Sequence, residues 1–99
     1  MQHIVNKSHA QTRSLESCLR FAQDGQALLL IEDGVYAATR GGAASSGLAA
    51  STGRLKVYAL QPDLEARGMA AALIEGVTAV DYGGFVDLVA EHSTSQSWL

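Results

Sequence analysis

The sequence contains little of several features that define whole classes of proteins. Cysteine and proline each occur once in 99 residues, and only 17% of the residues are charged. A single cysteine, Cys18, excludes an internal disulfide framework and a zinc site built from cysteines. Seven lysines and arginines stand against ten acidic residues and form no basic stripe, so the net charge of −3 argues against direct binding of nucleic acid.

Long apolar segments and targeting patterns are missing as well. The longest apolar run, residues 27–31, is far shorter than the roughly 20 residues that span a bilayer. The start of the chain, with Gln2 and His3, lacks the basic-then-apolar pattern of a secretory signal. We therefore expect a cytoplasmic protein without a membrane partner, in which Cys18 is a free thiol.

Short motifs for common cofactors and metals are also absent. Gly41 and Gly42 do not have the spacing of a GxGxxG loop, and there is no GxxxxGK[ST], HExxH or GxSxG motif. The three histidines, His3, His9 and His92, are too far apart to match a short-range metal pattern. We expect no cofactor and no metal, and we interpret His3 as a strand residue that forms hydrogen bonds inside the fold.

What the chain does have is an excess of apolar residues for its size. Hydrophobic residues make up 47% of the sequence, which indicates a folded protein, and the length predicts a single domain over residues 1–99. Because a domain this small cannot bury all of its apolar surface, part of that surface is expected in a subunit interface.

The pattern along the chain is that of strands alternating with helices. Strands are expected at residues 3–6, 26–32, 54–60 and 77–80, and helices at residues 14–23, 35–38, 46–50, 62–67 and 81–92. The unbroken apolar run of the second strand is typical of a strand buried on both faces. The alternation predicts an α/β fold with a parallel sheet and helices on both faces.

Local signals refine this pattern at three positions. Ser14 is a candidate N-cap for the first helix, and Pro62 fits the first turn of a later one. In the helix of residues 81–92, Phe85, Leu88 and Val89 are expected on one face.

Cys18 is the residue with the most obvious chemistry. A thiol can attack, can carry sulfur as a persulfide, or can simply fill space. Its helix face, with the spacing i, i+3, i+4 and i+7, consists of Leu15, Cys18, Leu19 and Ala22 and should point at the sheet. A buried cysteine is inert, whereas one near the positive end of a helix can be reactive, so both readings stay open.

Two further places could carry function. Glu32 and Asp33 follow the buried strand, where α/β folds place ligands, although Asp33 followed by Gly34 is also typical of a turn. Trp98 lies at the end of the sequence, where it either folds back on the core or anchors a partner.

Seven segments, taken in order, resemble the TusB/DsrH family of sulfur relay subunits. They are HIVNKS (residues 3–8), SLESCLRFA (14–22), LLLIEDGVYAA (28–38), LKVYAL (55–60), PDLEARG (62–68), VDYGGFVDL (80–88) and HSTSQSW (92–98). No single segment is diagnostic, but the ordered set covers nearly the whole chain. The small-residue run at residues 39–53 is not distinctive.

The resemblance implies a fold and a set of partners. The fold would be a Rossmann-like, three-layer α/β/α domain of the DsrEFH type, with a small, mainly parallel sheet of four to five strands. The chain would assemble with homologous TusC/DsrF-type and TusD/DsrE-type subunits into a heterohexamer. That complex would receive persulfide sulfur from a small carrier of the TusA type and pass it to one of the TusE/DsrC type.

The resemblance also implies two pathways and two roles for Cys18. The sulfur ends in 2-thiouridine at the tRNA wobble position in one branch and enters dissimilatory sulfur oxidation in the other. The main sulfur-bearing cysteine is on the TusD/DsrE-type subunit, but Cys18 matches a first-helix cysteine of DsrH-type members and is a candidate sulfur carrier, which favours the oxidation branch.

Two alternatives remain beside a sulfur-carrying subunit. The first is a purely structural subunit, in which sulfur is carried only by a homologous partner and Cys18 is packed between helix and sheet. The second is a stand-alone module for a small ligand, with Asn6, Lys7 and Asp33 at its site.

Overall fold

The architecture is that of a computed structural model, which describes residues 1–10, 13–42, 47–92 and 94–98. Five strands form one sheet in the order β4-β3-β2-β1-β5, and all neighbouring strands are parallel. The strands are β1 (Gln2–Val5), β2 (Ala27–Leu30), β3 (Lys56–Leu60), β4 (Val77–Val80) and β5 (Ser95–Trp98). The predicted parallel sheet is confirmed, and each of the four predicted strands is present.

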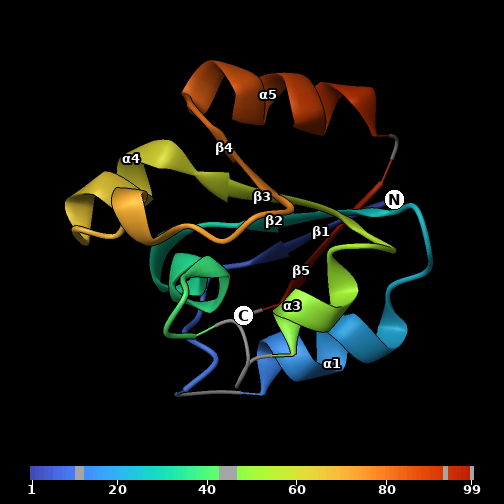
Figure 1. Cartoon of the computed structure of the whole chain (residues 1–99). Coiled ribbons are helices and arrows are strands. Elements are labelled where there is room, and N and C mark those ends of the chain that lie inside the picture. The colour runs from blue at the N-terminus through green and yellow to red at the C-terminus, as the bar shows by residue number, and fades with distance from the viewer. Residues whose placement is uncertain (11–12, 43–46, 93, 99) are drawn as a thin grey trace.

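The helices lie on both faces of the sheet, as predicted. They are α1 (Ser14–Phe21), α3 (Leu48–Ser51), α4 (Gln61–Ala66) and α5 (Tyr82–Glu91), with the 3-10 helices η1 (Glu32–Ala38) and η2 (Ala70–Ala72). In Figure 1, α1 and α3 lie below the sheet and α5 lies above it. The connections from β1 to β4 all move in one direction across the sheet, whereas the connection from β4 to β5 runs back in the opposite direction. Because crossover connections are right-handed, connections that run in opposite directions place their helices on opposite faces of the sheet.

The main core fills the space between the lower face of the sheet and the helices beneath it. Its strand side chains alternate along the strands, as one face of a sheet requires: Val5, Leu28, Leu30, Val57, Ala59 and Val77. Leu15 and Cys18 of α1 pack against them, together with Leu48 of α3. All four residues of β2 are buried, so the prediction of a strand covered on both faces is confirmed.

The last strand is the element that the hydrophobic pattern of the sequence does not show. Residues Ser95–Trp98 are polar except for the final tryptophan, and Ser95, Gln96 and Ser97 are exposed. The strand is defined instead by its pairing with β1, in which Gln2 lies opposite Ser95 and Val5 opposite Trp98.

One of three local predictions about helices is wrong and two are confirmed. The N-cap position of α1 is Arg13 rather than Ser14, and no side-chain hydrogen bond caps the helix there. Phe85, Leu88 and Val89 lie on one face of α5, at i, i+3 and i+4, although Val89 is 39% exposed. Pro62 does lie in the first turn of α4. The predicted short helix at residues 46–50 begins at residue 48, and residue 46 lies outside the described residues.

Candidate functional site

Cys18, the candidate sulfur carrier, lies in the core between α1 and the sheet. The Cys18 side chain has no exposed surface, and Leu15 on the same helix is 1% exposed. Burial raises the pKa of the Cys18 thiol from 9.0 to about 12, because the thiolate loses the stabilisation that water gives it. The positive charge of Arg54 lowers this pKa, but by less than burial raises it.

The Arg54 guanidinium is already engaged at the end of α1. It donates hydrogen bonds to the carbonyl oxygens of Leu19 (2.6 Å) and Ala22 (2.8 Å). These groups are among the last carbonyls of the helix, which lack partners within it. Arg54 therefore caps α1 rather than activating the thiol. Sequence reasoning missed this role because Arg54 is 35 residues from Leu19 in the chain.

Glu32 and Asp33, the acidic pair that follows β2, connect η1 with α4. The Glu32 backbone has φ 50°, and its N–H donates to Asp63 Oδ2 at 2.7 Å. Asp33 accepts from Arg67 Nε at 2.9 Å, and this hydrogen bond raises the pKa of Arg67. The Glu32 backbone and the Asp33 carboxylate thus join η1 to Asp63 of α4 and to Arg67 at its end. This supports the turn interpretation of Asp33.

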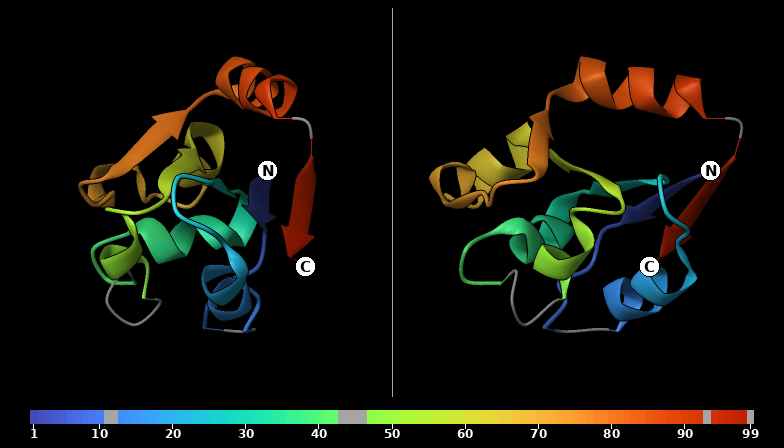
Figure 2. Two further views of the ribbon diagram at one scale, coloured as in Figure 1. Left: turned by 90° about the vertical axis from the view of Figure 1, so that its right-hand side faces the viewer. Right: turned by 45° about the vertical axis from the view of Figure 1, so that its right-hand side comes forward.

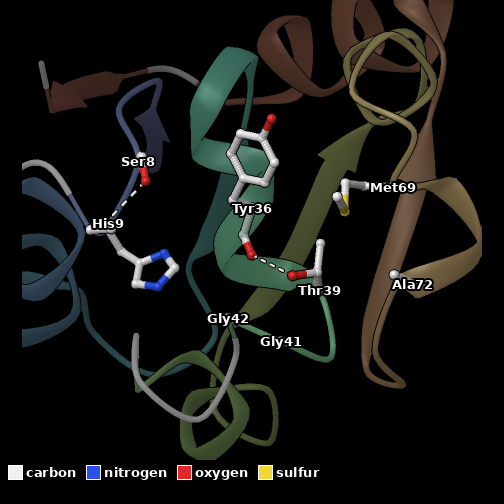
Figure 3. A pocket seen from close by; sticks show the side chains of 9 residues that line it. Ser8, His9, Tyr36, Thr39, Gly41, Gly42, Met69 and Ala72 are labelled. Carbon is white, nitrogen blue, oxygen red and sulfur yellow. Dashed lines mark hydrogen bonds between the residues drawn. The ribbon is translucent and has the colours of Figure 1, made fainter.

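A cavity of about 370 Å³ opens at the carboxyl edge of the sheet (Figure 3). Its described lining consists of Ser8, His9, Ala10, Tyr36, Thr39, Gly41, Gly42, Met69 and Ala72. A second cavity of about 230 Å³ is lined by Ile31, Glu32, Leu60, Asp63, Tyr82 and Phe85. Neither described lining includes Cys18, Asn6, Lys7 or Asp33. The three residues of the stand-alone ligand module therefore do not come together in either of these two cavities, and Cys18 opens into neither of them.

His3 and Trp98 form a hydrogen-bonded contact beside the core. His3 is fully buried, and its Nδ1 accepts a hydrogen bond from Trp98 Nε1 at 3.2 Å. His3 Nε2 lies 2.8 Å from Gln26 Oε1. Gln26 Oε1 also accepts from the Gln23 backbone N–H, which identifies it as the oxygen. Because the indole can only donate and Gln26 Oε1 can only accept, His3 is the neutral tautomer with its proton on Nε2.

The Phe21 ring completes this cluster. Its centroid lies 6.1 Å from that of His3 and 5.8 Å from that of Trp98. Trp98 also packs against the main core. Of the two alternatives for Trp98, folding back on the chain is the one the structure shows, and the reading of His3 as an internal hydrogen-bonding residue agrees with its contacts.

Replacing Trp98 tests how β5 is held. We expect Trp98→Ala to lower the free energy of unfolding by about 2–3 kcal/mol, because the ring contacts and the bond to His3 are both lost. Trp98→Phe keeps a ring without the N–H and should cost about 1 kcal/mol. Urea unfolding followed by circular dichroism measures both. Equal midpoints for wild type and Trp98→Ala would show that the indole does not anchor β5.

Two further features are absent from the ranges that the structure describes. No group of three or more histidine, cysteine, aspartate or glutamate side chains is placed to hold a metal ion. No helix there has the length and apolar character needed to cross a bilayer.

Together these features define a class of protein: a small three-layer α/β/α domain whose only thiol is sealed in its core. The chain belongs to the TusB/DsrH family: the model of the family described as DsrH like protein matches residues 7–95.

Relatives of known name agree with this assignment. Protein TusB of Pectobacterium parmentieri is 40% identical over 100 residues, which cover 99% of this chain and 100% of that protein. Protein TusB of Enterobacter sp. (strain 638) is 42% identical with the same coverage, and that of Shigella flexneri is 36% identical over 98 residues.

A solved structure shows the same fold at lower identity. MTH1491, a protein of unknown function from Methanobacterium thermoautotrophicum, superposes with a TM-score of 0.73. The superposition covers 97% of this chain and 95% of that one, at 23% identity. The likeness supports the α/β fold class.

Proposed function

We propose that this chain is a structural subunit of a sulfur relay complex. It assembles with homologous TusC/DsrF-type and TusD/DsrE-type subunits, as members of its family are expected to do, into a heterohexamer. Persulfide sulfur moves from a TusA-type to a TusE/DsrC-type carrier through a cysteine of a partner subunit. The observation that carries this role is the burial of Cys18, which leaves the chain without an accessible thiol.

The chemistry of sulfur exchange explains why burial decides the role. Transfer of a persulfide needs a thiolate that can reach the incoming sulfur atom, and the rate follows thiolate content and access. Cys18 has no exposed surface, and burial raises its pKa to about 12. Both conditions for exchange are therefore unmet in the folded chain, and Cys18 serves to fill the core.

The pathway that we propose for the complex is 2-thiolation of the tRNA wobble uridine. The relatives at 36–42% identity bear the name TusB, which belongs to that branch. The match of Cys18 to a first-helix cysteine of DsrH-type members favours the sulfur-oxidation branch, but the burial of Cys18 leaves that match without a role in sulfur transfer. The acidic net charge of −3 fits a subunit that leaves the tRNA to another protein.

The deciding experiment follows sulfur by intact mass spectrometry of the assembled complex after exposure to a persulfide donor. We expect the mass of an added sulfur atom on the TusD/DsrE-type subunit and no added sulfur on this chain. A complex that contains Cys18→Ser should load and pass on sulfur as the wild type does. Added sulfur on this chain that disappears in Cys18→Ser would make Cys18 a relay site and would contradict the structural role.

A further inference from the structure

The two faces of the sheet are covered by different helices. α1 and α3 lie on one face together with η1, whereas α5 lies on the other (Figures 1 and 2). No residue of α5 is buried, although the helix carries Tyr82, Phe85, Val86, Leu88 and Val89. A helix on a folded domain normally buries one apolar stripe. The chain by itself therefore does not complete the packing of α5.

Part of the apolar surface of α5 forms one continuous flank. Tyr82 is 62% exposed, Val86 61% and Val89 39%. Their spacing, i, i+4 and i+7, places them one above the other along the helix. We call these three residues the apolar flank of α5. Contiguous exposed apolar surface of this kind marks an interaction site more often than single exposed residues do.

A glycine beside this flank fits close approach by another chain. Gly83 and Gly84 follow each other in the first turn of α5, where glycine is a poor helix former. A Cβ at Gly84 would lie 3.2 Å from Val80 Cβ, so packing within the chain accounts for that glycine. A Cβ at Gly83 would meet only Asp81 Oδ1, at 3.4 Å. The space above Gly83 is therefore free for a partner.

Charge indicates what kind of partner fits. Asp87 and Glu91 are exposed, and at i, i+4 they lie together on the other side of α5 from the apolar flank. The helix has no basic residue, and the ion pairs between described residues do not include these two. A second copy of this chain would bring the same acids and a net charge of −3 to the contact. Lysine or arginine beside an apolar surface would complement them.

We propose that the apolar flank of α5, with Gly83, is the surface that binds a different, homologous subunit of the complex. The contact surface of that subunit is apolar and bordered by lysine or arginine. This inference rests on the proposed function, because it takes the occupant from the relay complex. Binding there buries the apolar flank and supplies the packing that α5 lacks.

The test compares Val86→Glu with wild type in binding to the purified TusC/DsrF-type and TusD/DsrE-type subunits, measured by calorimetry and native mass spectrometry. We expect affinity to fall about 100-fold, because a charge replaces the centre of the apolar flank. The isolated variant should melt as the wild type does, since Val86 is 61% exposed. The matched control is Ala50→Glu, which places a charge at an exposed position of α3, on the opposite face of the sheet, and should leave the affinity unchanged.

The acidic residues provide the second arm of the test. Asp87→Lys combined with Glu91→Lys should weaken binding of the homologous subunits about 10-fold, through repulsion of their basic border. If wild type and Val86→Glu bind equally well, the assignment of α5 is wrong while the proposed function stands. If wild type does not bind these subunits, the proposed function fails as well. Self-association of the isolated chain that Val86→Glu abolishes would make a second copy the occupant and overturn the inference.

Discussion

Gly34→Ala should unfold the chain under conditions that the neighbouring variant Gly41→Ala tolerates. A Cβ at Gly34 would collide with the backbone carbonyl oxygen of Val5 and would lie 3.0 Å from its carbonyl carbon. Val5 cannot move aside, because β1 pairs with β2 on one side and β5 on the other. The Val5 carbonyl also accepts the Ile31 N–H at 3.0 Å.

The expected loss of stability is about 3 kcal/mol or more, the range of severe overpacking against immobile backbone. A small domain has only about 5–15 kcal/mol in total, so much of the chain should be unfolded at moderate urea concentration. The control, Gly41→Ala, places a Cβ with nothing within 4 Å and should change stability by less than about 1 kcal/mol. Coincident urea midpoints for the two variants would show that η1 does not pack against β1 as described.

The hydrophobic pattern of the sequence predicted most of the fold, because most helices and strands have a signal in their own local sequence. The run of residues 27–31 indicated a doubly buried strand, and the spacing around Cys18 indicated the helix face that is buried against the sheet. Pro62 marked a helix start. Such signals depend on neighbours in the chain, and they were sufficient for the strands β1 to β4 and their helices.

What the sequence did not show depends on contacts between distant residues. β5 is polar, and it is a strand only because β1 offers it a free edge, at a separation of 93 residues between Gln2 and Ser95. The cap that Arg54 provides for α1 is likewise a tertiary contact. The chemistry of the candidate site also depends on a contact of this kind. The spacing of apolar residues placed Cys18 on the inward face of α1, but how deeply the thiol is buried depends on how closely the sheet and α1 pack.

Cys18 should react with iodoacetamide about 1,000-fold more slowly in the folded chain than in the unfolded chain at pH 8. A thiol with the usual pKa of 9.0 is roughly one-tenth thiolate at that pH, whereas one with a pKa of about 12 is roughly one ten-thousandth thiolate. Burial adds a steric barrier to this difference. Labelling followed by mass spectrometry gives the rate, with urea-unfolded protein as the fast reference and Cys18→Ser as the blank. Rapid labelling of the folded chain would show that α1 opens, and a carrier role for Cys18 would again be possible.

The same burial should make the chain sensitive to alkali. Between pH 9 and pH 12 the unfolded chain loses the Cys18 proton while the folded chain keeps it, so each pH unit above 9 costs about 1.4 kcal/mol of stability. Below pH 9 the Cys18 thiol is protonated in both the folded and the unfolded chain, so the burial of Cys18 contributes its full stability there. Cys18→Ala lacks the titration, although the removed sulfur leaves a cavity that costs about 1–2 kcal/mol. We therefore expect wild type to be the more stable protein at pH 7 and Cys18→Ala to be the more stable at pH 11. Urea unfolding at both pH values measures the difference, and a stability gap that does not change with pH would mean that the Cys18 thiol is in contact with water.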